Sequence, residues 1–200
     1  MPEDLEADML MRLSSWLHEV SKGWVAFVGL LIFLLFTALV LPGQSQKAEK
    51  ISGEAGSPDT SFFYSPADLA RMAEAYGEQG REAYLQARFT FDLIFPIVYT
   101  FFLATSVSWV FGKSFPASSR WQLANLVPLL GMLCDYLENI TASFVMLRYP
   151  APTPFAAALA PVFTLLKWSF IGLSFGLLVT GSLAGLWQWG KRRLGKSHPE

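Results

Sequence analysis

The feature that most constrains this chain is residues 123–147, an apolar run long enough to cross a bilayer that also contains Asp135, Glu138 and Asn139. A helix needs about 20 mainly apolar residues to span roughly 30 Å of hydrocarbon. Ionisable side chains inside such a helix usually face a bundle interior, a partner or a cavity, because lipid does not solvate them. The run therefore predicts a membrane-spanning helix and, on it, a candidate site.

Three further apolar runs have the length of a span, at residues 24–41, 89–111 and 160–189. The 200 residues are 52% hydrophobic and only 16% charged, whereas soluble domains average about 25% charged residues. We therefore expect an all-α protein: an integral membrane four-helix bundle over residues 23–190. The composition gives no support for nucleic-acid binding.

Residues 1–22 predict an amphipathic helix, because their apolar residues are spaced by three and four. This helix either lies on the membrane surface or packs on the bundle as a solvated helix. The stripe consists of Leu5, Met9, Leu10, Leu13, Trp16, Leu17 and Val20. A secretory signal peptide is an alternative for the first apolar run, but the long, acid-rich region before it and the absence of a clear A-x-A site disfavour cleavage.

Residues 42–88 form a long connection, predicted to begin as loop over 42–60. Ser65 followed by Pro66 is typical of a helix start, and we expect Gly77 and Gly80 to break that helix. The connection is long and patterned enough to be a lid or a partner surface. Aromatic residues that precede the cap predict an interfacial anchor: Phe62, Phe63 and Tyr64.

Prolines lie within the later spans. Pro96 removes one backbone hydrogen bond and frees a carbonyl, which a neighbouring group or water must satisfy. The fourth apolar run, residues 155–189, exceeds one vertical span, so it is either tilted or starts as an interfacial segment broken at Pro161.

Basic residues in the short connections predict the orientation. Lys113 and Arg120 share one side of the membrane with the basic tail, residues 191–200, so both termini should be cytoplasmic and residues 42–88 should lie on the outer side. An aromatic belt at the cytoplasmic interface agrees with this: Trp24, Trp109, Trp121, Trp187 and Trp189.

With that topology, helical rise brings six polar residues to one layer near the outer surface: Arg88, Asp92, Asp135, Glu138, Asn139 and Lys167. Three carboxylates face two cations there. The excess acid should be held protonated, or should bind a cation or an amine. Nearby aromatic residues could line a pocket above the layer, although ordinary helix packing also explains them: Tyr99, Tyr136, Phe95, Phe163 and Trp168.

Two interpretations of this layer remain open. In one it is a structural ion-pair network, with Arg88 and Lys167 against the carboxylates, that fixes helix packing, and the protein is a structural or regulatory subunit that contacts a membrane-protein partner through residues 60–88. In the other it binds a lipid or another hydrophobic or amphipathic small molecule, with Asp92, Asp135 or Glu138 as candidate general acid or base. The ligand-binding candidates are Asp92, Tyr99, Asp135, Tyr136, Glu138, Asn139, Lys167 and Trp168.

A proton or cation pathway is a third interpretation, but the inner halves of the helices supply only a few hydroxyl groups: Thr105, Ser106, Ser108, Ser174 and Thr180. A single cysteine, Cys134, and two histidines outside the apolar runs give no Cys-based or His-rich metal centre. No cofactor is expected.

The layout resembles the EXPERA family, which includes emopamil-binding-type sterol isomerases and the sigma-two receptor. The resemblance lies in an acid before a proline in the second span, Asp92 and Pro96, and in a proline before acids in the third, Pro128 and Asp135. It implies a sterol-like or cationic amphiphile held between the helices by carboxylates. The first span here has no acid and no span has a histidine, so binding, rather than sterol isomerisation, is what the resemblance implies.

Overall fold

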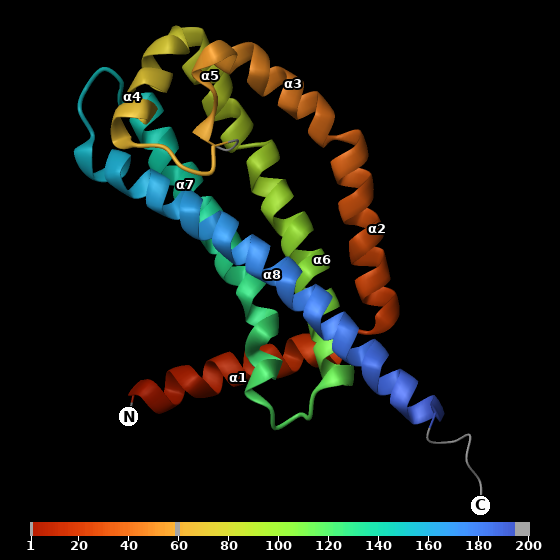
Figure 1. Ribbon diagram of the computed structural model, residues 1–200. Coiled ribbons are helices and arrows are strands. Elements are labelled where there is room, and N and C mark those ends of the chain that lie inside the picture. Colours follow the sequence, from red (N-terminus) through yellow and green to blue (C-terminus); the bar gives the residue numbers. More distant parts are fainter. Residues whose placement is uncertain (1, 59–60, 195–200) are drawn as a thin grey trace, which may run out of the picture.

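The computed structural model describes residues 2–58 and 61–194, and these are helical except for short connections. Four long helices run along one another: α2 (Gly23–Leu39), α6 (Phe91–Ser114), α7 (Val127–Arg148) and α8 (Pro154–Leu194). At the upper end in Figure 1 lie α3 (Leu41–Ser52), α4 (Pro66–Ala75) and α5 (Gly77–Arg88). At the lower end, α1 (Pro2–Val20) crosses the bundle, and a 3-10 helix (Arg120–Leu126) leads into α7.

Two helical stretches are long and apolar enough to cross a membrane: Gly77–Ser114, which joins α5 to α6, and Pro154–Lys191 of α8. Helices α1 and α2 would together count as a third, although the chain bends by 90° between them. The all-helical prediction is therefore confirmed, with two or three helices able to span. The arrangement of four spans stays a prediction.

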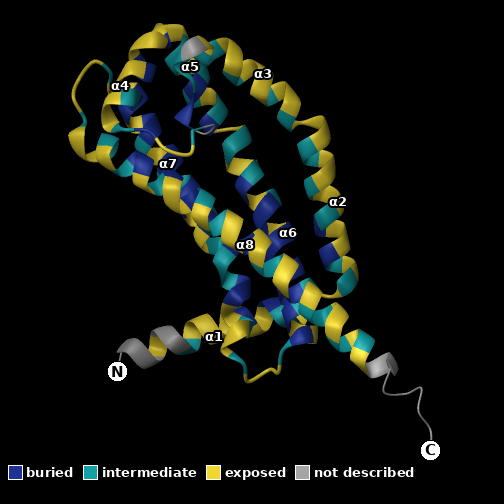
Figure 2. Ribbon diagram, viewed as in Figure 1, coloured by how far each residue is buried: buried dark blue, intermediate teal, exposed yellow. Residues whose placement is uncertain are grey.

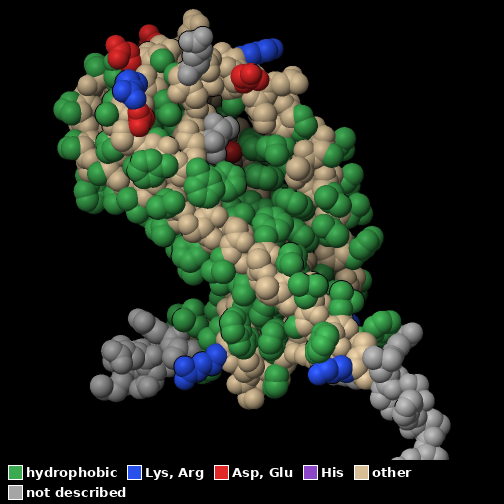
Figure 3. Space-filling model, viewed as in Figure 1, with side chains coloured by type: hydrophobic (Ala, Val, Ile, Leu, Met, Phe, Trp, Pro, Cys, Tyr) green, Lys and Arg blue, Asp and Glu red, His purple; other side chains and the backbone are tan. Residues whose placement is uncertain are grey.

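Helix α6 occupies the centre of the bundle. Its side chains between Tyr99 and Phe111 are mostly buried, whereas the outward side chains of α2 and α8 are exposed and apolar (Figure 2). Phe33 of α2 stacks on Phe102 of α6 with ring centroids 5.0 Å apart. Figure 3 shows a flank covered mainly by hydrophobic side chains, with the coloured acidic side chains in the upper part. Such a large apolar surface is typical of a protein that faces lipid.

Small residues set the closest contacts of the bundle. A Cβ atom on Gly181 of α8 would lie 2.5 Å from the ring of Phe111 in α6, and one on Gly131 of α7 would lie 3.3 Å from Ile171 of α8. Small residues at such crossings let helix backbones approach within a membrane. The α6–α8 and α7–α8 seams therefore depend on these glycines.

The outer connection begins differently from the prediction. Residues 41–52 form α3 rather than loop. Pro42 lies at the first turn, where a missing N–H costs nothing, and residues 44–50 contain Gln, Lys, Ala and Glu, which favour helix. Residues 59–60 of this connection lie outside the described residues.

Two predicted breaks also need correction. Gly80 lies inside α5, and Gly77, with φ +62°, alone turns the chain between α4 and α5. Pro161 does not end a helix: α8 is continuous from Pro154 to Leu194, so an interfacial segment broken at Pro161 is wrong and a tilted helix remains. Membrane helices tolerate proline when neighbouring groups satisfy the freed backbone. Residues 195–200 of the predicted basic tail lie outside the described residues.

The predicted start of α4 is confirmed. Ser65 is the N-cap: its hydroxyl accepts a hydrogen bond from the Asp68 backbone N–H, and the Asp68 carboxylate accepts one from the Ser65 N–H at 2.8 Å. The Ser65 hydroxyl also donates to the Asp68 carboxylate at 2.7 Å, and this hydrogen bond, together with the one from the Ser65 N–H, lowers the pKa of Asp68. The reciprocal cap satisfies two backbone donors that would otherwise have no partner, and it fixes where the outer helices begin.

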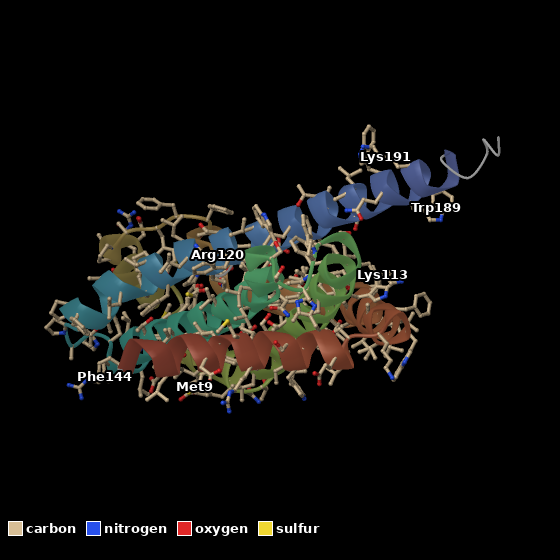
Figure 4. All side chains as sticks on the ribbon, turned by 90° about the horizontal axis from the view of Figure 1, so that it is seen from below. Met9, Lys113, Arg120, Phe144, Trp189 and Lys191 are labelled. Carbon is tan, nitrogen blue, oxygen red and sulfur yellow. The ribbon has the colours of Figure 1, made fainter. Side chains whose placement is uncertain are left out.

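Helix α1 packs on the bundle, which is one of its two predicted positions; a position on the membrane surface stays a prediction. Its polar side docks on the bundle: Ser14 donates to the Gln122 carbonyl at 3.0 Å, and His18 contacts the carbonyls of Ser108 and Gln122 through its two ring nitrogens. Most of its apolar side chains remain exposed (Leu5, Met9, Leu10, Leu13, Trp16 and Val20), and Met9 points away from the bundle in Figure 4. The helix is thus packed on the protein, with its apolar stripe open to a second contact.

Candidate functional site

The centre of the predicted polar layer is Lys167 of α8. Its ammonium forms an ion pair with Glu138 and lies 3.8 Å from Asp135 Oδ1, both on α7. All three side chains are buried, with 1% of Glu138 and 4% of Lys167 exposed. Glu138 and Asp135 are three residues apart on α7 and therefore share one helical face. This pair of contacts connects α7 to α8.

A second ion pair lies where α5 meets α6. Arg88 donates from Nη1 to Asp92 Oδ2 at 2.6 Å, and its guanidinium lies 4.3 Å from the centre of the Tyr84 ring. Arg88 is buried, whereas 17% of the Asp92 side chain is exposed. The pair closes the short break at residues 89–90 and places Asp92 at the start of the central helix.

Tyr99 and Asn139 join the two ion pairs. The Tyr99 hydroxyl donates to Asp135 Oδ2 at 3.0 Å. Asn139 donates to Asp135 Oδ1 at 3.4 Å and makes a long contact of 3.5 Å with the Asp92 carbonyl. That carbonyl is the one Pro96 would leave without its helical partner, because Pro96 has no N–H. The predicted need for a neighbour at this position is therefore met by a side chain of α7.

The structure brings together all six polar residues of the predicted layer, contributed by the end of α5, by α6, by α7 and by α8. Of the predicted lining residues, Tyr99 faces the layer, while Tyr136 points to α6 and donates to the Leu93 carbonyl at 2.9 Å. The ring of Trp168 lies 5.4 Å from the Lys167 ammonium and stacks on Phe62, centroids 6.0 Å apart. Trp168 thus connects the layer to residues 61–65, the segment before α4, which we call the outer segment.

Sequence reasoning missed the contribution of the outer segment. Tyr64 is not an interfacial anchor: only 3% of it is exposed, and its hydroxyl is hydrogen-bonded to that of Thr164, 3.0 Å away, one turn of α8 from Lys167. Burial raises the pKa of the Tyr64 hydroxyl. Phe62 and Phe63 are exposed, as an anchor requires. The three aromatic residues are consecutive, and their sequence shows no helical or strand periodicity that would separate the buried one from the two exposed ones.

Buried acceptors on α7 lack hydrogen-bond donors among the described residues. Glu138 Oε1, Asn139 Oδ1 and Ser143 Oγ have no hydrogen-bond partner there. Glu138 Oε2 also makes no hydrogen bond of good geometry, but it is paired with the Lys167 ammonium. A buried polar atom without a partner lowers the stability of the fold. A donor from a water molecule or a bound molecule would remove this penalty at each of the three atoms.

The charges in the layer do not balance. Among the described residues it contains three carboxylates, Asp92, Asp135 and Glu138, and two cations, Arg88 and Lys167. A net buried charge is strongly unfavourable in an apolar environment. Uptake of a proton or of a cationic group would neutralise the excess, which is the chemistry that this arrangement can offer.

One hollow lies next to the layer. A hollow of about 570 Å³ beside α4 has Tyr64, Met72 and the Asp68–Arg71 ion pair among its lining residues. Tyr64 separates this hollow from Thr164 and Lys167. A second groove lies at the opposite end of the bundle. In the part of the chain that the structure describes, no group of three His, Cys, Asp or Glu residues could hold a metal ion.

Hydroxyl groups in the lower half of the bundle donate hydrogen bonds to backbone carbonyls of their own helices. Thr105 donates to the Phe101 carbonyl at 2.6 Å, Ser174 to that of Phe170 at 2.7 Å, and Thr180 to that of Gly176 at 2.9 Å. Bonds to the carbonyl of the preceding turn are the usual way in which a hydroxyl is satisfied inside a helix. They do not form the continuous polar chain that a proton or cation pathway needs.

No family model, curated protein or solved structure matches this sequence. The resemblance to the EXPERA family therefore stays a prediction, and the residues of the layer carry the functional argument by themselves.

Proposed function

We propose that this protein is a four-span membrane protein that binds the polar end of a lipid or another amphipathic small molecule at the layer around Glu138. The observation that carries the proposal is the unbalanced buried charge, three carboxylates against two cations, beside acceptors that lack donors. A ligand with an amine or hydroxyl group would supply both the missing charge and the missing donors.

In this proposal the side chains of the layer have different roles. Lys167 and Arg88 hold the carboxylates in place. Asp135 and Glu138 face the ligand, and the Tyr99 hydroxyl also fixes Asp135. Asp92, the most exposed of the three acids, is the one through which a proton could exchange, so general acid–base chemistry would use Asp92, Asp135 or Glu138. The apolar part of the ligand would lie towards Trp168 and the outer hollow that reaches Tyr64.

The experiment is native mass spectrometry with lipid extraction on the purified full chain. We compare wild type with Asp135→Asn and Glu138→Gln, and we use Glu78→Gln, an exposed acid on α5, as the matched control. We expect one amphiphile to co-purify with wild type and the control and to fall at least about tenfold in either layer variant, since a hydrogen bond to a charged group contributes roughly 1.5–3 kcal/mol. Equal retention by all four proteins would contradict binding at the layer.

The second candidate is a structural or regulatory subunit whose layer only fixes helix packing. The direct Lys167–Glu138 and Arg88–Asp92 contacts favour it. Phe63, 77% exposed on the outer segment, would then contact the partner protein. This candidate predicts that nothing co-purifies, that both layer variants lose stability alone, and that Phe63→Ser releases a partner while the fold is kept.

A further inference from the structure

A separate groove of about 530 Å³ lies between the last turns of α6 and α8, at the end of the bundle that α1 crosses. Its walls include Trp109, Val110 and Lys113 of α6, and Leu186, Gln188 and Trp189 of α8. Asp92 and Lys113 are 21 residues apart along α6, which corresponds to about 30 Å at the helical rise. The groove is therefore independent of the polar layer.

The charge of this groove has one sign. The Lys113 ammonium supplies this charge and lies 4.4 Å from the centre of the Trp109 ring. Lys191 lies 5.0 Å from the centre of the Trp187 ring, and neither of these two residues lines the groove. No acidic residue occurs among the lining residues of the groove, all of which are described. Figure 4, seen from below, shows Lys113, Trp189 and Lys191 towards one side of the molecule, with Trp189 and Lys191 on opposite sides of α8. The groove thus offers positive charge beside apolar walls.

The floor of the groove is made of small residues and fixed by hydrogen bonds. Gly185 and Ser182 of α8 lie there, opposite Ser114 of α6. Ser114 donates from Oγ to the Gly181 carbonyl at 3.1 Å, and Gln188 donates from Nε2 to the Ser114 carbonyl at 2.6 Å. An amide group carries two N–H donors, so Gln188 retains one for a molecule in the groove.

We propose that this groove binds one anionic phospholipid, with the phosphate at Lys113 and Gln188 and an acyl chain along Val110 and Leu186. Trp109 and Trp189 would lie at the level of the glycerol backbone, where tryptophan side chains are enriched. Charge complementarity selects this occupant, because a basic, acid-free groove beside interfacial tryptophans attracts a negative headgroup. A neutral helix of a partner protein would leave Lys113 without a counter-charge.

The test titrates the detergent-solubilised full chain with phosphatidylglycerol or phosphatidylcholine and counts bound lipids by native mass spectrometry. Lys113→Gln removes the charge, and Ser182→Phe fills the groove. The matched control is Arg120→Gln, which makes the same charge change at the same end of the bundle, in the 3-10 helix before α7, without lining the groove. We expect phosphatidylglycerol affinity to fall about fivefold in Lys113→Gln, from the interaction of one basic residue with anionic lipid, to be lost in Ser182→Phe, and to be unchanged in Arg120→Gln.

Three results would overturn the proposal. Equal affinity for phosphatidylcholine would show that the charge selects nothing, and equal phosphatidylglycerol affinity in all four proteins would place the lipid elsewhere. Displacement of the lipid by millimolar inorganic phosphate would identify a free anion as the occupant. Because Glu138→Gln leaves this groove intact, it should retain phosphatidylglycerol whatever happens to the ligand of the layer.

Discussion

Lys167 is the side chain on which the buried layer depends, because it faces Glu138 and Asp135 together. Removing one member of a buried ion pair leaves the other charge without compensation, which costs about 3–5 kcal/mol. Exposed lysines carry no such penalty. A single substitution in the layer should therefore destabilise the protein more than a paired substitution that removes both charges.

We predict that Lys167→Met lowers the free energy of unfolding by about 3–5 kcal/mol, and that the double variant Lys167→Met/Glu138→Leu recovers most of the loss. Reversible denaturation in mixed micelles measures both. Lys50→Met, at an exposed position of α3, is the control and should change stability by less than about 0.5 kcal/mol. A double variant as unstable as the sum of its parts would show that the two side chains do not interact.

At the scale of helices, α6 is central because α2, α7 and α8 all pack on it, and α8 contacts it at the level of Gly181. The ring of Phe111, 1% exposed, fills the space that a side chain at position 181 would need. Crowding of a packed interface by even one methyl group forces backbone shifts that cost about 1–3 kcal/mol. The crossing of α6 and α8 is therefore sensitive to the smallest substitution.

We predict that Gly181→Ala destabilises the protein by about 1–3 kcal/mol, visible as a lower melting temperature in detergent. Gly172→Ala, in the same helix with nothing within 4 Å of the added Cβ, is the matched control. It should be neutral or slightly stabilising, since alanine has the higher helix propensity. If the two variants melt alike, α6 and α8 do not approach as closely as described.

At the scale of the whole molecule, the outer helices α3–α5 and the α1 end lie at opposite ends of the bundle (Figure 1). An apolar flank separates them (Figure 3). If four spans cross the membrane, the ends lie in different compartments, with Lys113 and Arg120 on the cytoplasmic side. Side-specific chemistry distinguishes this arrangement from one with fewer spans.

We predict that Glu78→Cys reacts with a membrane-impermeant maleimide on intact cells and that Ser118→Cys reacts only after permeabilisation. Both positions are exposed, and Cys134→Ala provides the cysteine-free background because the chain has one cysteine. The cysteine-free protein is the control and should not react. Labelling of both positions from the same side would exclude the proposed topology.

The sequence alone determined the helical class, the start of α4 at Ser65 and the convergence of six polar residues. These follow from local rules: apolar run length, cap chemistry and the rise of a helix. The layer was predictable because charged side chains in apolar helices have few acceptable positions.

Tertiary structure decided what these local rules do not contain. Only packing placed Tyr64 against Thr164, turned the polar side of α1 towards Gln122, and kept α8 continuous through Pro161. It also placed the hollow beside the layer and opened a basic groove at the far end of α6. The physical reason is that contacts between distant segments depend on which helices lie together, and an apolar stripe fits lipid and protein equally well.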